Sequence, residues 1–154
     1  PSLRPGAATM NDPLTERIIA CAFSVANRLG PGFLEKVYEN AMAYELGKCG
    51  LAYRQQQGIE VQYEGVIVGQ FMADLVGEGR VILELKATRE SSEFHTAQCL
   101  NYLKGANLPI CLLINFQRTK LEWKRIIRSP GSSHDSIRVY PGKLSHEQPQ
   151  ALDS

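Results

Sequence analysis

The sequence has little cysteine, and the cysteines it has form no recognisable metal-binding or disulfide pattern. No two of the four are spaced as C-x-x-C, and no histidine lies near enough along the chain to complete a zinc knuckle. Cys21 and Cys111 stand among apolar neighbours, where a free thiol behaves as a small hydrophobe. We therefore expect reduced, mostly buried thiols in a cytoplasmic protein at Cys21, Cys49, Cys99 and Cys111.

Long apolar runs are also missing, as is an excess of charge of one sign. No run approaches the roughly 18–20 apolar residues that span a bilayer, so we expect no membrane partner. Seventeen Lys and Arg face sixteen Asp and Glu, a formal net charge of +1, which excludes a histone-like polycation but allows a local basic patch. Residues 1–10 have no long apolar core, and we expect a disordered leader or a cloning remnant rather than a secretory signal.

The chain does have the length and periodicity for one α/β domain. Its 154 residues are 44% apolar, enough to bury one core. Helical spacing, strict alternation and one continuous apolar run divide residues 11–128 into helices and strands. We expect helices at 14–29, 33–48 and 93–106, and strands at 53–63, 66–76, 80–87, 109–116 and 121–128. This order predicts a mixed sheet flanked by helices. A weakly ordered tail follows over 129–154, in which only 137–140 is a candidate strand.

Local signals refine the helices. Asp12 precedes Pro13 and is a capping acceptor for the first helix, and Ser91 or Ser92 is a candidate cap for the third. In the second helix, helical spacing predicts one apolar stripe for packing. That stripe comprises Phe33, Val37, Ala41 and Tyr44.

Two carboxylates and a lysine form the first candidate site. Glu84 and Lys86 are two apart on a predicted strand and share a face. If the hairpin turn centres on Gly79, Asp74 lies opposite Glu84, and the two acids form a hard-oxygen site for Mg²⁺ or Mn²⁺, to which the Leu85 carbonyl adds an oxygen. Lys86 would then orient a bound water or stabilise phosphate charge. An ordinary cross-strand ion pair is the alternative.

Two helices carry further polar candidates. Glu35 and Tyr38 share a face in the first turns of the second helix, where the helix dipole stabilises a carboxylate. His95, Gln98 and Tyr102 fall on one face of the third helix and suit phosphate or backbone contacts. For Glu35 and Tyr38 the alternative is that the acid only stabilises the first turn of the helix. For His95, Gln98 and Tyr102 the alternative is a solvated helix surface.

The last predicted strand is basic. Between residues 118 and 128 five Lys or Arg residues stand against one acid, with Trp123 among them. Such a strip fits binding to a nucleic-acid backbone, with Lys124 and Arg125 as candidate contacts. An edge strand protected by charge against aggregation is an equal alternative.

Taken together, these residues resemble the GxxExxY protein family of the PD-(D/E)xK nuclease superfamily. The resemblance runs from about Pro13 to Arg128. Six landmarks occur in order, and the sequence departs from the superfamily pattern at Ala73, where proline is usual. The landmarks are the stretches 30–38, 63–65, 71–75, 82–87, 97–103 and 113–116, followed by Lys124-Arg125-Ile126.

The resemblance implies a restriction-endonuclease-like core and a nuclease that uses Mg²⁺ or Mn²⁺. Asp74 and Glu84 would be the metal ligands, Lys86 the catalytic lysine and Glu35 a supporting carboxylate. Gln98 and Tyr102 match a Gln-x-x-x-Tyr element that holds substrate in related branches, with His95 and Tyr38 expected beside it. The partner would be nucleic acid, with DNA favoured, and a homodimer is compatible with the family. The alternatives are a non-catalytic nucleic-acid- or partner-binding module and a hydrolase of a small phosphoester.

Overall fold

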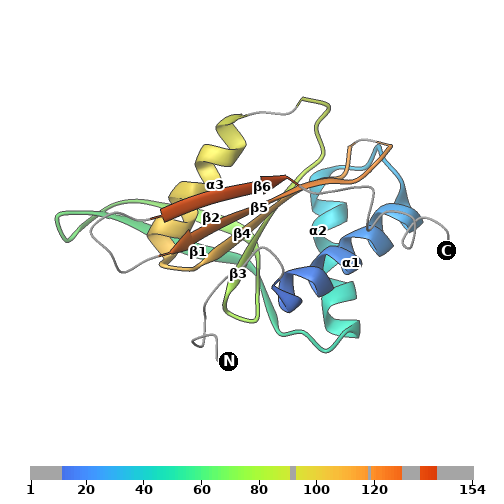
Figure 1. The fold of residues 1–154 in the computed structure, drawn as a ribbon, viewed down its shortest axis with the longest axis horizontal. Coiled ribbons are helices and arrows are strands. Elements are labelled where there is room, and N and C mark those ends of the chain that lie inside the picture. The colour runs from blue at the N-terminus through green and yellow to red at the C-terminus, as the bar shows by residue number, and fades with distance from the viewer. Residues whose placement is uncertain (1–11, 91–92, 118, 130–135, 142–154) are drawn as a thin grey trace.

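The protein is described by a computed structural model over residues 12–90, 93–117, 119–129 and 136–141. Helices and strands follow one another in these residues as Figure 1 shows. The elements are α1 (Pro13–Leu29), α2 (Glu35–Lys48), β1 (Tyr53–Tyr63), β2 (Val66–Gly77), β3 (Val81–Lys86), α3 (Glu93–Ala106), β4 (Ile110–Asn115), β5 (Glu122–Ser129) and β6 (Ser136–Pro141). Every helix and strand expected between residues 11 and 128 is present, with small differences at the ends.

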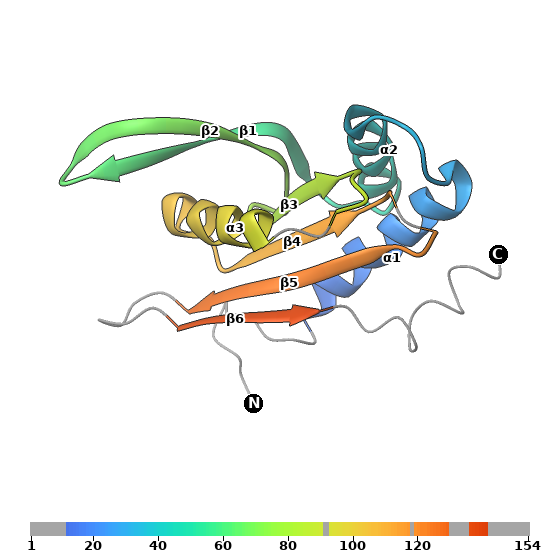
Figure 2. The same ribbon diagram turned by 90° about the horizontal axis from the view of Figure 1, so that it is seen from above.

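The strands form one mixed sheet in the order β1-β2-β3-β4-β5-β6. Neighbours are antiparallel except β3 and β4, which run parallel because the chain crosses over between them through α3. Figure 2 shows α1 and α2 on one side of the sheet and α3 on the other. The architecture is therefore the helix-flanked mixed sheet that the sequence predicts.

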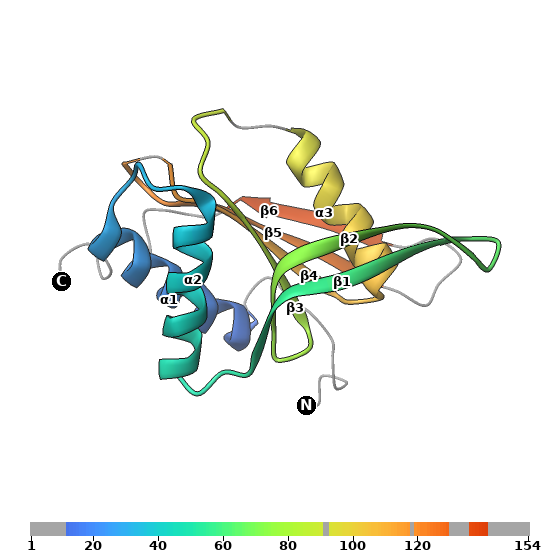
Figure 3. The same ribbon diagram turned by 180° about the vertical axis from the view of Figure 1, so that it is seen from behind.

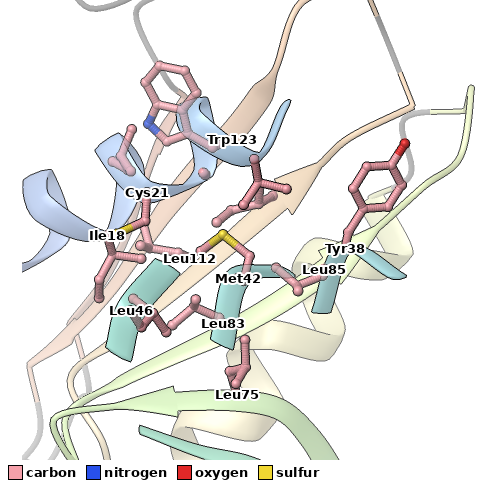
Figure 4. Packing of buried hydrophobic residues seen from close by; sticks show 14 of the residues in the cluster. Ile18, Cys21, Tyr38, Met42, Leu46, Leu75, Leu83, Leu85, Leu112 and Trp123 are labelled. Carbon is pink, nitrogen blue, oxygen red and sulfur yellow. The ribbon is translucent and has the colours of Figure 1, made fainter. Parts of the chain in front are cut away.

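The larger core lies between the sheet and the pair α1 and α2 (Figure 4). Strand β3 contributes Val81, Leu83 and Leu85, which alternate as predicted, and they meet Ile18 of α1 and Met42 of α2. A second core under α3 is built on Ile82, from the opposite face of β3. Because β3 is buried on both faces, a polar side chain on it lies inside one of the two layers.

Helix α1 begins at the predicted cap. The Asp12 carboxylate accepts hydrogen bonds from the backbone N–H groups of Leu14 at 2.8 Å and Thr15 at 3.4 Å. The same carboxylate forms an ion pair with Arg80, next to the turn between β2 and β3. The start of α1 is thus tied to the hairpin that carries the candidate carboxylates. The predicted caps Ser91 and Ser92 lie outside the described residues.

Helix α2 buries a different face from the one predicted. Tyr38, Met42 and Leu46 are fully buried, whereas Phe33 precedes the helix and is exposed, as is Tyr44. The predicted apolar stripe is therefore wrong. The apolar residues of α2 occur on all sides of the helix, so their spacing alone cannot predict which side α1 and β3 cover.

The part of the hairpin farthest from the core projects as a two-stranded arm. Strand β2 pairs with β3 only through Leu75, Val76 and Gly77, so its earlier residues pair with β1 alone. Figures 2 and 3 show these paired strands extending past the rest of the sheet, and we call residues 57–73 the arm. The predicted turn at its tip, Glu64-Gly65, has positive φ at both residues, as a tight two-residue hairpin turn requires.

The sheet continues beyond the predicted domain boundary at residue 128. The candidate strand at 137–140 lies within β6, which pairs antiparallel with β5 from Ser129↔Ser136 to Lys124↔Pro141. The remainder of the predicted tail and the leader at 1–10 lie outside the described residues. None of the described helices is long and apolar enough to cross a membrane.

The cysteines are all free, and most are buried, as expected. Cys21, Cys99 and Cys111 are buried, and Cys49 is exposed. The sulfur atoms of Cys21 and Cys49 lie 3.6 Å apart, within hydrogen-bonding distance, and form no disulfide.

Candidate active site

The register between β2 and β3 places the two central carboxylates opposite each other. Leu75 pairs with Leu83 and Gly77 with Val81, so the turn centres on Gly79, as expected. The next pair outward in this register is Asp74 with Glu84. Here β2 separates from β3 into the arm, which leaves room for both side chains.

Each carboxylate is held by the backbone beside the other. The backbone N–H of Asp74 donates to Oε1 of Glu84 at 3.1 Å, and the N–H of Leu85 donates to Oδ2 of Asp74 at 2.8 Å. Within the described part of the chain, the second oxygen of each carboxylate carries no hydrogen bond. Both acids thus have one oxygen fixed and one available to a further ligand.

Burial and mutual repulsion shift the titration of this pair. Desolvation, followed by the charge of Asp74, raises the pKa of Glu84 to about 8. Desolvation also raises the pKa of Asp74, with the charges of Glu39 and Glu35 adding to the effect. Lys86 partly offsets both shifts but forms no salt bridge with either acid in the described residues. This arrangement differs from an ordinary cross-strand ion pair, and it favours a cation between the carboxylates.

Glu35 lies at the N-terminus of α2, next to the end of β3. Its Oε2 accepts a weak hydrogen bond from the backbone N–H of Ala87 at 3.4 Å. Because its charge contributes to the pKa shifts of both Asp74 and Glu84, the structure brings it into the same site, as expected.

Helix α3 brings two of its three candidate residues to the carboxylates. The negative charges of Glu84 and Asp74 add to desolvation in raising the pKa of Tyr102, which is buried at 5% exposure. Partial burial and the positive charge of Lys86 lower the pKa of His95, whose Nδ1 is buried without a hydrogen-bond partner. Gln98, on the same helix, is half-buried. Lys124 reaches this helix from β5, and its Nζ donates to Oγ1 of Thr96 at 3.3 Å.

Comparison with known protein families identifies the family of the chain. The family model described as the PD-(D/E)XK nuclease superfamily matches residues 12–126. The chain belongs to the PD-(D/E)XK nuclease superfamily. Its helix-flanked mixed sheet agrees with the restriction-endonuclease-like fold of that superfamily. Among the curated proteins and among the solved structures, nothing matches the chain.

Three side chains that the sequence suggested for substrate contact are buried in the fold. Tyr38 is fully buried: its hydroxyl donates to the Gly30 carbonyl at 2.6 Å and its ring stacks on Phe116. Arg125 is buried against α1, where it forms an ion pair with Glu16. Alternation along β5 turns it to the sheet face opposite Lys124. Trp123, on the same face as Arg125, is buried edge-on to the ring of Phe23, so the predicted basic strip does not include an exposed aromatic.

Sequence reasoning missed one acid near the candidate site, the buried Glu39 of α2, whose charge contributes to the raised pKa of Asp74. Lys36 donates to both of its oxygens at 3.0 and 3.1 Å, and the amides of Gln55 and Gln56 donate at 2.8 and 2.9 Å. Gln56 has a φ of 53°. In the register between β1 and β2 it lies opposite Asp74, between the pairs Gln55↔Leu75 and Gln57↔Ala73. Glu39 therefore ties α2 to the part of β1 that lies opposite Asp74. Its spacing of four from Glu35 was the available signal.

The donor set fits Mg²⁺ or Mn²⁺. Within the described residues no three His, Cys, Asp or Glu side chains form a ready metal cage. Asp74 and Glu84 each offer one uncommitted carboxylate oxygen. The N–H of Leu85 points at Asp74, and the C=O of a strand residue points to the same side as its N–H, so this carbonyl also faces the pair. A site that offers a small number of protein oxygens and leaves space for bound water suits a hard divalent cation.

Proposed function

We propose that the protein is a metal-dependent nuclease that hydrolyses phosphodiester bonds of nucleic acid, with DNA as the favoured polymer. The observation that carries the proposal is the pair Asp74 and Glu84, held face to face beside Lys86 in a chain of the PD-(D/E)XK nuclease superfamily. We further infer membership of the GxxExxY family. A cytoplasmic location and a homodimer stay predictions.

The roles follow from the donor chemistry. Asp74, Glu84 and the Leu85 carbonyl would hold the cation, and Glu35 would complete the site directly or through water. The bound cation would supply Lewis acidity and a water of lowered pKa. The Lys86 ammonium would orient that water or donate to the scissile phosphate, where its positive charge offsets the developing negative charge.

Residues on α3 and β5 would contact the substrate. Tyr102 and His95 border the carboxylates, and Gln98 lies on the same helix between them. Lys124 shares the face of Glu84: the register runs from Glu84 through Leu113 to Lys124 across β3, β4 and β5. A lysine there would contact a phosphate next to the one cleaved. Tyr38 and Arg125 are left out because both are buried in structural contacts.

The test is a cleavage assay on labelled single-stranded DNA, duplex DNA and RNA, with Mg²⁺, Mn²⁺ or EDTA. Wild type should cleave at least one polymer with metal and none with EDTA. Lys86→Ala should lose about 10²-fold or more, because a positioned cationic group acts in the transition state. Arg28→Ala, at an exposed residue in the last turn of α1 that has no part in the proposed mechanism, is the control and should keep full activity.

Two results would contradict the proposal. Equal cleavage by wild type and Lys86→Ala would place the activity elsewhere. No cleavage of any polymer by wild type, with metal binding confirmed, would favour the small-phosphoester hydrolase or the non-catalytic binding module.

A further inference from the structure

A groove of about 1200 Å³ lies between the arm and the second half of α3. The arm and the start of β1 line one side of it, and residues 101–108 line the other. It does not include Asp74 or Glu84, so it is separate from the carboxylate site. Figure 2 shows α3 running alongside the arm.

The two walls are fixed against each other where α3 meets β1. A Cβ on Gly105 would lie 3.0 Å from Cγ2 of Ile59 and 3.1 Å from the carbonyl oxygen of Glu60, so helix and strand lie in direct backbone contact. Ile59 is itself buried there. The groove is therefore preformed, as ligand-binding grooves usually are.

The lining is rich in side-chain amides and carries two cations. Its polar side chains include the amides of Gln57, Gln62, Gln70 and Asn101 together with Arg54 and Lys104. Across the described ranges neither Arg54 nor Lys104 forms an ion pair, and both are exposed. The acid on the lining is Glu60. Amides both donate and accept hydrogen bonds, which suits base edges, while the two cations suit phosphates.

The groove adjoins the carboxylate site through two aromatic rings in contact, tilted 38° to each other. Phe71 lines the groove, and its ring centroid lies 4.0 Å from that of Tyr102. Tyr102 in turn packs in the same buried cluster as Ala73, the neighbour of Asp74, and the charges of Glu84 and Asp74 contribute to the raised pKa of Tyr102. A polymer in the groove that continued past these two rings would reach the carboxylates.

We propose that this groove binds a single-stranded segment of nucleic acid and leads it to the carboxylate site. The inference rests on the proposed nuclease function and adds the strandedness of its substrate. In a single strand the base edges are free to meet the amides, and aromatic rings can stack on the bases. In a duplex the bases are paired, and two cations against one acid would neutralise little of its phosphate charge.

The test measures binding without cleavage, in the Lys86→Ala background. Fluorescence anisotropy compares labelled single-stranded DNA, single-stranded RNA and duplex DNA over a range of salt. Single strands should bind more tightly than duplex. Adding Arg54→Glu and Lys104→Glu should weaken single-strand binding about tenfold or more and reduce the salt slope by about 0.7 for each lost phosphate contact. Adding Arg28→Glu instead applies the same charge reversal outside the groove and should change little.

Two outcomes would overturn the inference: tighter binding of duplex than of single strand, or equal weakening by the groove changes and by Arg28→Glu. Arg54→Lys keeps the positive charge and should retain most of the affinity, whereas loss equal to that of Arg54→Glu would contradict a phosphate contact. Because binding is read in a variant that need not cleave, failure of the groove and failure of the nuclease proposal are seen separately.

Discussion

At the scale of single residues, the site holds two acids close together, which lowers the stability of the metal-free folded protein. Burial and the charge of Asp74 raise the pKa of Glu84 to about 8, so without a cation the folded protein holds a proton that the unfolded chain releases near pH 4.5. Functional sites commonly trade stability for such an arrangement. The cost belongs to individual side chains, and substitution of one of them should relieve it.

Glu84→Gln should stabilise the metal-free protein above neutral pH. Because the folded pKa exceeds the unfolded one, the stability that wild type has at low pH is lost as the pH rises from about 4.5 through about 8. The glutamine has no such titration, so the variant should gain on the order of a few kcal/mol at pH 8–9 and almost nothing at pH 5. Thermal unfolding in EDTA from pH 5 to 9 measures this.

The exposed Glu90→Gln is the control and should change the pH profile of unfolding very little. If Glu84→Gln and wild type keep the same difference in stability from pH 5 to 9, Glu84 does not take up a proton on folding.

At the scale of elements, the arm and α3 depend on a close approach that glycine permits. Gly105 lies in α3 against Ile59 and Glu60. Gly47 lies in α2, where an added Cβ would have as its nearest neighbour Cε2 of Tyr53 at 3.7 Å. Both are next to the last residue of their helices. Substituting these two glycines therefore separates the effect of helix propensity on stability from the effect of packing.

Gly47→Ala should stabilise the protein by up to about 1 kcal/mol, because alanine is the better helix former and the site has room. Gly105→Ala gains the same propensity but forces α3 and the arm apart, so it should be less stable than Gly47→Ala by about 1–2 kcal/mol. Urea unfolding of the two variants gives the difference directly. Equal stability would mean that α3 and β1 do not pack as closely as the structure describes.

At the scale of the whole molecule, one sheet carries two different faces. The face toward α1 and α2 holds the larger apolar core, and the face toward α3 holds the carboxylates, Lys86 and Lys124. A cation bound where β2 leaves β3 would join the arm, the sheet and the start of α2. Its binding should thus stabilise the folded chain as a unit.

Mn²⁺ at ten times its Kd should raise the free energy of unfolding of wild type by about 1.4 kcal/mol, since the ion binds only the folded state. Asp74→Asn removes a ligand charge and should abolish that gain at the same concentration. Thermal unfolding with Mn²⁺ and with EDTA provides the measurement. An equal gain in wild type and Asp74→Asn would exclude the carboxylate pair as the metal site.

The sequence by itself determined the elements, the hairpin register and the placement of Asp74 beside Glu84. Alternation in β3, the turn at Gly79 and the cap at Asp12 are local signals, because each depends on residues within a few positions of one another. Glu84 and Lys86 share a face by the two-residue period of a strand. Locality made these features predictable.

Only the tertiary structure decided which sides of the elements are covered. Glu39 meets Gln55 and Gln56, which are 16 and 17 residues away, and Arg125 meets Glu16 across 109 residues of chain. Such partners leave no periodic signal in the sequence. Tyr38 likewise belongs to a motif that predicted a place beside the substrate, yet it is fully buried where α2 packs on the core. Burial is a property of what covers a side chain, and that is settled only when distant segments meet.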